Sequence, residues 1–148
     1  MLSTTCKYAV RAIIFIAQKG TSESRVNARI IASELGIPMQ FLSKILQIFV
    51  RRELLQSFKG PTGGFFLAKD PYDITLFEIV EIIDGPGFFE TCLIGNGTCD
   101  GSVNKKKRCP VHDDYSQVRK KVIEYFKSEN IGNIVEKMDH DEDILLKL

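Results

Sequence analysis

The stretch NARIIASELGIPMQFLSKILQIF, residues 27–49, decides the fold, because it holds two helical patterns separated by a short joint. In the first, over residues 28–35, Asn27 suits the N-cap, Gly36 suits the C-cap, and the apolar stripe consists of Ile30, Ile31 and Leu35. The second has Pro38 in its first turn, and its inward face is predicted to consist of Phe41, Leu42, Ile45, Leu46 and Phe49. Two amphipathic helices joined by so short a turn are typical of the helix-turn-helix unit, whose second helix enters the major groove of DNA.

A predicted β-hairpin follows directly. Residues 54–58 and 65–67 have strand character, and between them lies the breaker run Gly60-Pro61-Thr62-Gly63-Gly64, with Lys59 at the base of the hairpin. The run does not fit a nucleotide-binding loop, because its lysine precedes the glycines and no Gly-Lys-Ser/Thr follows. A hairpin directly after a helix-turn-helix predicts a wing, whose glycines let the backbone approach a phosphate or the minor groove.

Further helical patterns flank this unit. Apolar residues recur at helical spacing over residues 8–17, which predicts a helix with one side against the core. Thr75 and Glu78 form a capping box that opens another helix, and this helix ends at Asp84 and Gly85. The predicted fold class is therefore mainly α with a small β-hairpin wing.

The C-terminal part is predicted to hold a long helix from Pro110 through Phe126, because its apolar residues recur at helical spacing. This apolar stripe has few partners left inside so small a body, so we expect it to meet its copy in a second subunit. Residues 131–138 predict a short helix, and residues 139–143 a solvated tail.

We therefore divide the chain into three parts. Residues 1–85 are expected to form a winged helix-turn-helix DNA-binding domain. Residues 86–109 form a cysteine-rich loop expected to bind a cluster, and residues 110–148 form a dimerisation helix with a C-terminal tail.

Composition limits the classes of protein that the chain can belong to. With 148 residues, 44% of them hydrophobic, it can bury one core, which excludes a large multidomain enzyme. No segment approaches the roughly 18 uninterrupted apolar residues needed to span a bilayer, so we expect a cytoplasmic protein without a membrane partner. The chain has only His112 and His140, no Cys-x-x-Cys and no paired carboxylate motif, so we expect no enzymatic activity.

Charge is distributed unevenly along the chain. Residues 1–69 carry ten basic and three acidic side chains, a net charge of +7, whereas residues 70–148 carry ten basic and sixteen acidic ones, a net charge of −6. A basic half can offset phosphate repulsion and release counterions from a nucleic acid. The N-terminal half is therefore the expected DNA-binding half.

Three of the four cysteines, Cys92, Cys99 and Cys109, lie in one irregular loop that leads to His112. Because no signal peptide precedes them, metal binding or redox chemistry is a more fitting use than disulfide bonding. Three cysteines and a histidine suit a structural zinc site or an iron-sulfur cluster with one non-cysteine ligand, and the chemistry of the ligands does not separate the two. Unliganded thiols are the third interpretation.

Several features of the loop favour the larger of the two inorganic centres, the iron-sulfur cluster. Paired Cys-x-x-Cys turns, common in zinc knuckles, are missing, and glycines at positions 95, 97 and 101 let the backbone wrap a larger object. The basic run at residues 105–108 would stabilise thiolates and an anionic cluster.

Short motifs along the chain carry a resemblance to a known family. They are Tyr8-Ala9-Val10-Arg11-Ala12, Ile31-Ala32, Gly36-Ile37-Pro38, Phe41-Leu42, Ile45-Leu46, Gly60-Pro61, Gly63-Gly64-Phe65, Leu67-Ala68, Asp70-Pro71, Ile74-Thr75 and Cys109-Pro110-Val111-His112. In this order they resemble the Rrf-two family of winged helix-turn-helix transcriptional regulators, typified by IscR, NsrR and CymR. The resemblance covers essentially residues 1–126.

The resemblance implies a homodimer that binds a palindromic operator in double-stranded DNA through the winged domain. It also implies a redox-active 2Fe-2S or 4Fe-4S cluster held by Cys92, Cys99 and Cys109. Protein purified in air can lose such a cluster. His112 falls where some members place the fourth ligand. Others use an acidic residue from the partner's N-terminal helix, where this chain has Lys7, which cannot serve while it is protonated.

The chain departs from the family pattern at two places. The gap before Cys109 is longer than usual and Cys6 lies close to where a partner ligand would approach, so Cys6 or a partner-subunit residue stays an alternative to His112. At the start of the wing, Arg52 and Glu53 replace the usual small residue and glycine.

The residues expected to contact DNA lie on the second helix of the unit and on the wing. Gln40, Ser43 and Lys44 are expected to read base edges or nearby phosphates. Phosphate contacts are expected from Arg51, Arg52 and Lys59, and the wing tip, including Gly60, Thr62 and Gly63, would approach the backbone or minor groove.

The sequence therefore predicts a DNA-binding transcriptional regulator, expected to be a repressor, that senses redox, iron or nitric oxide status through an iron-sulfur cluster. The alternatives are the same regulator with a zinc site or with a cluster-free cysteine thiol switch. A small metal or thiol enzyme is the least favoured.

Overall fold

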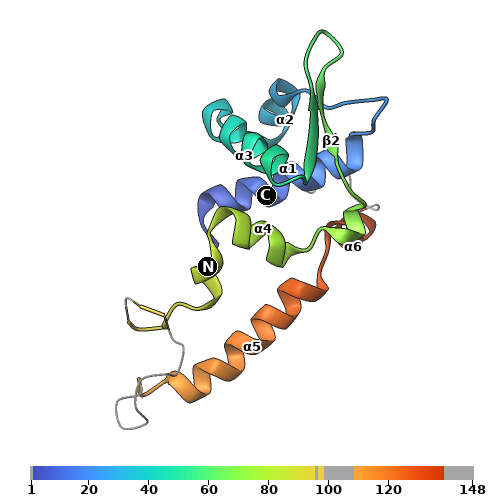
Figure 1. Ribbon diagram of the computed structural model, residues 1–148. Helices are drawn as coiled ribbons and strands as arrows, with labels where there is room; N and C mark the ends of the chain where they lie inside the picture. The colour runs from blue at the N-terminus through green and yellow to red at the C-terminus, as the bar shows by residue number, and fades with distance from the viewer. Residues whose placement is uncertain (1, 96, 99–108, 139–148) are drawn as a thin grey trace.

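A computed structural model describes residues 2–95, 97–98 and 109–138 of the chain. Its elements are α1 (Thr4–Lys19), α2 (Ala28–Leu35), α3 (Met39–Arg51), β1 (Leu55–Phe58), β2 (Gly64–Leu67), η1 (Pro71–Asp73), α4 (Leu76–Ile83), η2 (Pro86–Phe89), α5 (His112–Ser128) and α6 (Ile131–Met138). The chain is mostly helical with one antiparallel hairpin, which confirms the predicted fold class. Figure 1 shows the hairpin at one end of the molecule and the start of α5 at the opposite end.

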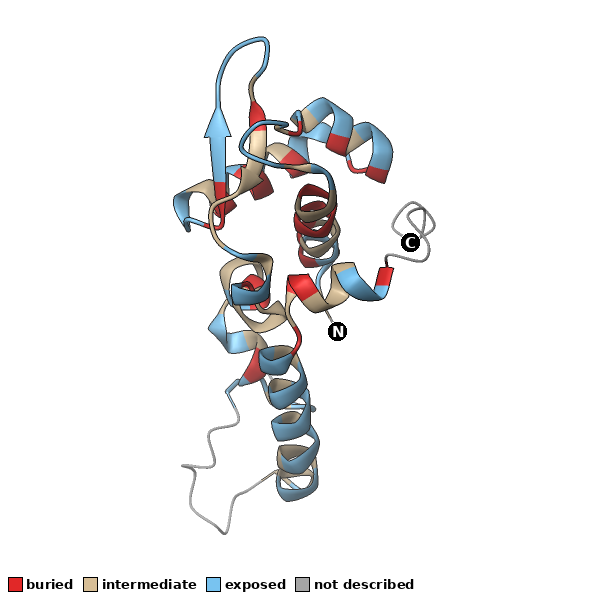
Figure 2. Cartoon of the chain, turned by 90° about the vertical axis from the view of Figure 1, so that its right-hand side faces the viewer, coloured by how far each residue is buried: buried red, intermediate tan, exposed pale blue. Residues whose placement is uncertain are grey.

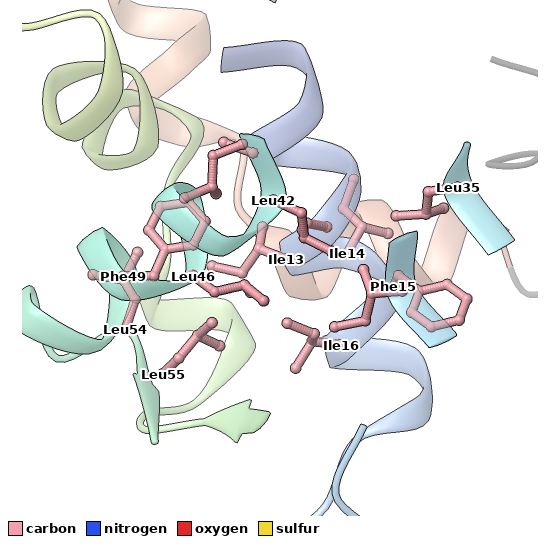
Figure 3. Close-up of a cluster of buried hydrophobic side chains, with 14 of the residues drawn as sticks. Ile13, Ile14, Phe15, Ile16, Leu35, Leu42, Leu46, Phe49, Leu54 and Leu55 are labelled. Carbon is pink, nitrogen blue, oxygen red and sulfur yellow. The ribbon is translucent and has the colours of Figure 1, made fainter. Parts of the chain in front are cut away.

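Helix α1 forms the centre of the core. Ser3 caps its first turn by accepting a hydrogen bond from the Cys6 amide at 3.0 Å, and the helix packs against α2, α3, α4, α6 and β2. Its side chains Ala9, Ala12, Ile13 and Ile16 are fully buried. Figure 3 shows Ile13 and Ile16 beside side chains from α3 and the start of the wing, among them Leu42, Leu46, Phe49, Leu54 and Leu55.

The helix-turn-helix follows the sequence prediction closely except at Ile30. This residue was predicted to belong to the apolar stripe of α2 with Ile31 and Leu35, but it is 53% exposed, while the other two are buried. The Asn27 side chain accepts from the Arg29 amide at 2.8 Å, and Gly36 ends α2 in the left-handed conformation, at φ 60°. Pro38 is the N-cap residue of α3 and does not lie in the first turn, a difference of one position.

The inward face of α3 is one residue smaller than predicted. Leu42, Ile45, Leu46 and Phe49 are buried, but Phe41 is 43% exposed and lies against Tyr8 of α1, with 6.4 Å between ring centroids. Phe41 lies in the first turn of α3, at the solvent edge of the apolar stripe, where Tyr8 of α1 covers it in part. The prediction that Phe41 belongs to the core is therefore wrong.

The wing is a two-stranded antiparallel hairpin in which Leu55 pairs with Leu67 and Phe58 pairs with Gly64. Val26, just before α2, adds a further bridge, because it exchanges two backbone hydrogen bonds of 2.9 Å with Phe65. Gly64 permits this approach, since a Cβ there would lie 2.7 Å from the Val26 carbonyl oxygen.

The capping box at α4 is only half formed. The Thr75 hydroxyl accepts from the Glu78 amide at 3.1 Å, as predicted. The Glu78 carboxylate does not return to the cap but accepts from Lys69 at 2.8 Å. Lys69 follows the wing, so this ion pair connects the wing to α4.

Helix α5 extends away from the core, and no residue of it is fully buried (Figure 2). It begins two residues later than predicted, with Val111 as N-cap, so Pro110 precedes the helix. Helix α6, predicted at residues 131–138 and found there, returns to pack on α1 and η1. The C-terminal segment is thus part of the core as well as an extension from it. The predicted tail at residues 139–143 lies outside the described residues.

Glu53, between α3 and β1, has a positive φ of 59°, and it is the position where the family pattern has glycine. A non-glycine residue in this conformation carries a strain of about 1–2 kcal/mol, because its Cβ approaches the neighbouring carbonyl. The carboxylate side chain is exposed. The turn into the wing is therefore strained in this chain.

Replacing Glu53 with glycine should raise the free energy of unfolding by about 0.5–1 kcal/mol, since the relieved strain exceeds the extra flexibility of glycine in the unfolded chain. Urea denaturation followed by circular dichroism measures the change. Glu34→Gly, on the exposed face of α2, is the matched control and should lower stability by about 0.5–1 kcal/mol. Equal losses in both variants would show that position 53 is not strained.

Candidate nucleic-acid interface and cysteine site

The first turns of α3 present the residues predicted to read DNA. Burial of Leu42, Ile45 and Leu46 against α1 turns the opposite face of α3 outward. Gln40 and Lys44 are exposed on that face and Ser43 is partly buried. The three side chains therefore lie where a groove of DNA could reach them.

The tip of the wing also lies at the surface. Lys59, Gly60 and Thr62 are exposed, and Gly63 closes the turn by donating its amide to the Gly60 carbonyl at 3.0 Å. Gly60 has a positive φ of 107°, and a Cβ on Gly63 would lie 2.3 Å from the Phe58 carbonyl oxygen. The tight turn therefore requires both glycines and exposes their backbone.

Arg51 and Arg52 are exposed at the C-terminal end of α3. The Arg51 Nε donates to the Gln47 carbonyl at 3.4 Å, which holds its side chain along the helix. Gln40 and Arg51 are separated by about 16 Å along the helix axis. The predicted DNA-contacting residues of α3 are thus not one cluster but occupy both ends of the helix.

Cys92 lies in a small turn after η2. Its amide donates to the Gly97 carbonyl at 2.9 Å, and Thr91 and Thr98 form a bridge across the turn. The Cys92 side chain is partly buried, and a Cβ on Gly95 would lie 3.3 Å from its Sγ, so glycine leaves room beside the thiol. Cys99 lies outside the described residues.

Cys109 and His112 lie in one turn at the start of α5, where the His112 amide donates to the Cys109 carbonyl at 2.9 Å. Both side chains are partly buried. Figure 1 shows this turn and the small turn after η2, which holds Cys92, at the same end of the molecule. Within residues 2–95, 97–98 and 109–138, no three histidine, cysteine or acidic side chains gather closely enough to hold a metal ion.

A groove of about 700 Å³ lies beside Cys92. Its lining is mostly apolar and comes from the start of α1, from η2 and the turn after it, and from α5; it includes Phe88, Phe89, Tyr115 and Phe126. Lys7 also lines this groove. It stands at the position where the family resemblance puts an acidic cluster ligand for the partner subunit, so that position faces the same groove as Cys92.

Cys6 is fully buried, in a small core cluster with Val80 and Phe89. Burial, together with the neighbouring Asp84 carboxylate, raises the pKa of the Cys6 thiol to about 12. A thiol that is neutral and has no exposed surface does not fit the alternative in which Cys6 ligates a cluster.

Asp84 is a residue that sequence reasoning missed. Its carboxylate accepts from the Ser3 amide at 3.0 Å and also from the Ser3 hydroxyl, so it joins the end of α4 to the start of α1. A carboxylate at the C-terminal end of a helix is disfavoured by the helix dipole. This misplaced charge was the one sequence signal that could have pointed to a tertiary partner.

Known proteins resemble the chain over most of its length. The Rrf2 family model, described as an iron-dependent transcriptional regulator, matches residues 2–137. A protein of Aquifex aeolicus that bears the name putative HTH-type transcriptional regulator is 30% identical over 135 residues, covering 91% of each chain. The HTH-type transcriptional regulator IscR of Vibrio cholerae is 24% identical and covers 95% of this chain and 76% of its own. These relatives are named as regulators of transcription, not as enzymes.

Solved structures share the fold. CymR, the global cysteine regulator of B. subtilis, superposes with a TM-score of 0.77 at 20% identity, covering 94% of this chain and 98% of its own. IscR of T. potens gives a TM-score of 0.71 at 23% identity, covering 96% and 90%. No helix in the described part of the chain has the length and apolar character needed to cross a bilayer.

In the folded protein without a bound cluster, Cys6 should resist alkylation by iodoacetamide at pH 8, while Cys92 and Cys109 react, because the Cys6 thiol is buried and its pKa is raised to about 12. Digestion and mass spectrometry identify the modified residues, and denatured protein, in which Cys6 should react, is the control. Rapid labelling of Cys6 in folded protein would contradict its burial.

The raised pKa of Cys6 also predicts how stability depends on pH. Since the folded state keeps the Cys6 proton while the unfolded state loses it, the free energy of unfolding should fall as pH rises above 9.

Proposed function

Because this chain belongs to the Rrf2 family of transcriptional regulators, of the IscR and CymR type, we propose that it is a homodimeric repressor that senses redox, iron or nitric oxide status through an iron-sulfur cluster. Residues 1–85 bind a palindromic operator, residues 86–109 contribute the cluster cysteines and residues 110–148 contribute the dimer interface. The site of action is the cytoplasm, where the operator DNA is.

The observation that carries the DNA interface is the exposed basic and polar surface at the start of α3 and at the wing tip. Gln40 and Lys44 face outward from a helix whose other face is buried, and Lys59 stands at the base of a tight glycine turn. An α-helix fits the major groove, and a wing beside it reaches the backbone or the minor groove. In this arrangement Gln40 and Ser43 read base edges while Lys44 and Lys59 neutralise phosphates. Arg51 and Arg52, at the far end of α3, contact the backbone.

Replacing Lys44 and Lys59 with alanine should weaken DNA binding and reduce the slope of log affinity against log salt by about 0.9 for each phosphate that is no longer neutralised. Fluorescence anisotropy with operator DNA over a series of salt concentrations measures this slope. Lys120→Ala removes the same charge from the exposed surface of α5 and should leave the slope unchanged. An unchanged slope in the Lys44 and Lys59 variants would place the DNA elsewhere.

The dimer interface is proposed on α5. Ile123 and Phe126 pack toward α4 and η2, whereas Val118, Val122 and Tyr125 form a second apolar stripe facing outward. Their exposed fractions are 55%, 39% and 55%. The opposite face of α5 packs on α4 and η2, and an outward apolar stripe of this kind is stabilised by a second copy of the same helix.

Val118→Glu should convert the dimer to a monomer, because it would bury an unpaired carboxylate in the interface. Size-exclusion chromatography with light scattering on the full chain measures the mass. Gln117→Glu adds the same charge one residue away, off the stripe, and should remain dimeric. If both variants keep the mass of a dimer, the subunits associate through another surface.

The described part of the cysteine site fits an inorganic centre. Cys92 and Cys109 are partly exposed, unlike Cys6, and Gly95 leaves room beside the Cys92 thiol. We place Cys92, Cys99 and Cys109 as the cluster ligands and His112 as the fourth, since the backbone turn keeps His112 beside Cys109. When bound, the cluster supplies a redox-sensitive centre, and the protein supplies thiolates, an imidazole and a partly apolar surround.

Anaerobically purified or reconstituted protein should be coloured, with visible absorption typical of an iron-sulfur cluster and with iron and sulfide in equal amounts. Cys92→Ser and Cys109→Ser should lose the colour, because each removes a thiolate ligand. Cys6→Ala is the matched control and should keep it. His112→Ala should shift the spectrum if His112 is the fourth ligand.

Two other results would favour the alternatives to a cluster, a zinc site or a thiol switch. Colourless protein with stoichiometric zinc after anaerobic reconstitution would establish a zinc site. Protein without metal that forms a Cys–Cys bond on treatment with peroxide would establish a thiol switch.

A further inference from the structure

The wing carries a cation–π contact that the proposed DNA residues do not include. The Arg25 guanidinium carbon lies 4.0 Å from the centroid of the Phe58 ring, on the strand that leads into the wing tip. Phe58 in turn stacks on Phe66 of β2, with centroids 5.9 Å apart and an angle of 20° between the rings. Arg25 is therefore held against the outer face of the hairpin.

Backbone pairing fixes the position of Arg25. Its neighbour Val26 is hydrogen-bonded in both directions to Phe65, so the segment before α2 runs alongside β2. Gly64 lets this segment come close, since a Cβ there would lie 3.1 Å from the Arg25 carbonyl carbon. The guanidinium thus moves with the wing and not as a free surface chain.

Beside this contact lies a notch of about 520 Å³ between the wing tip and the start of α2. Arg25 and Arg29 line it from one side, and Pro61, Thr62 and Gly63 line it from the other. Glu23 also lines the notch, but in the described part of the chain no ion pair joins it to either arginine. The Arg25 Nε is buried and has no hydrogen-bond acceptor among those residues.

The surroundings of the notch suit a phosphate group. Within the described residues, two guanidinium groups without a carboxylate partner lie opposite a backbone turn and a hydroxyl. Arginine binds phosphate oxygens through several N–H groups at once, and backbone amides and hydroxyls add to this. Thr62 and Gly63, which line the notch, belong to the wing tip already assigned to DNA, so the notch continues that surface.

We propose that this notch binds a phosphate of the DNA backbone, with Arg25 as its fixed member and Arg29 as its second cation. The proposal rests on the proposed DNA-binding function and extends the interface from the wing tip to the start of α2. Because the Phe58 ring holds Arg25 in place before binding, less side-chain freedom is lost when the phosphate arrives. Phe58 acts as a positioning residue, and Arg25 and Arg29 contact the phosphate.

Fluorescence anisotropy with a labelled double-stranded DNA of mixed sequence tests the notch, because phosphate contacts do not depend on base sequence. Arg25→Ala and Arg29→Ala should each reduce the salt slope by about 0.9 and weaken binding at every salt concentration. Arg25→Lys keeps the charge and should retain the slope. Lys120→Ala, on α5, is the control for loss of one positive charge.

Variants of Phe58 separate positioning from charge. Phe58→Leu should weaken binding while the salt slope stays the same, because both arginines remain but Arg25 is no longer held. Phe58→Tyr keeps an aromatic face and should restore wild-type affinity. Thermal unfolding of each variant checks the fold, and if Arg25→Ala is unfolded, the exposed Arg29 alone decides the test.

Failure of the notch and failure of the proposed function give different results. If wild-type protein does not bind DNA, the proposed function is wrong. If Lys59→Ala lowers the slope but Arg25→Ala and Arg29→Ala bind as the wild type does, DNA binding stands and the notch does not contact phosphate. A similar loss of DNA affinity in Phe58→Leu and Phe58→Tyr would show that the aromatic face does not position Arg25.

Discussion

The burial of α1 is the interaction on which the rest of the structure depends. Ala9, Ala12, Ile13 and Ile16 are fully buried, and α2, α3, α4, α6 and β2 all pack against this one helix. Because the same helix supports both the helix-turn-helix and the wing, it fixes the angle between the recognition helix and the hairpin. A side chain that fits this position badly would disturb every one of these contacts, since protein cores are packed as densely as organic crystals.

Helix α1 also connects the two ends of the molecule. Its N-terminal end is joined to α4 through Ser3 and Asp84, and Cys6 beside them packs against Val80 and Phe89. Phe89 belongs to η2, which leads directly to the small turn that holds Cys92. A continuous packed path therefore runs from the proposed sensing loop to the helix that carries the DNA-binding domain, and a movement of η2 has a physical route to α3.

Local features of the chain were predictable from sequence, whereas contacts made outside the local element were not. Asn27, Gly36 and Thr75 were placed correctly as caps, because each cap depends on residues within a few positions of itself. Phe41 was assigned to the core although it is 43% exposed, and the partner of Glu78 is Lys69 and not the cap. Both differences come from partners outside the helix itself: Phe41 lies against Tyr8 of α1, and Glu78 pairs with Lys69, nine residues before it.

For this protein the sequence by itself determined the order of elements, the helix-turn-helix with its wing, the family and the basic character of the N-terminal half. Periodicity, caps and glycine turns act locally, so they can be recognised along the chain. Only the tertiary structure decided that Cys6 is buried beside Asp84, that α6 returns to α1 and that Arg25 lies on Phe58. Each of these contacts joins segments far apart in sequence, and their pairing depends on how the helices pack in space.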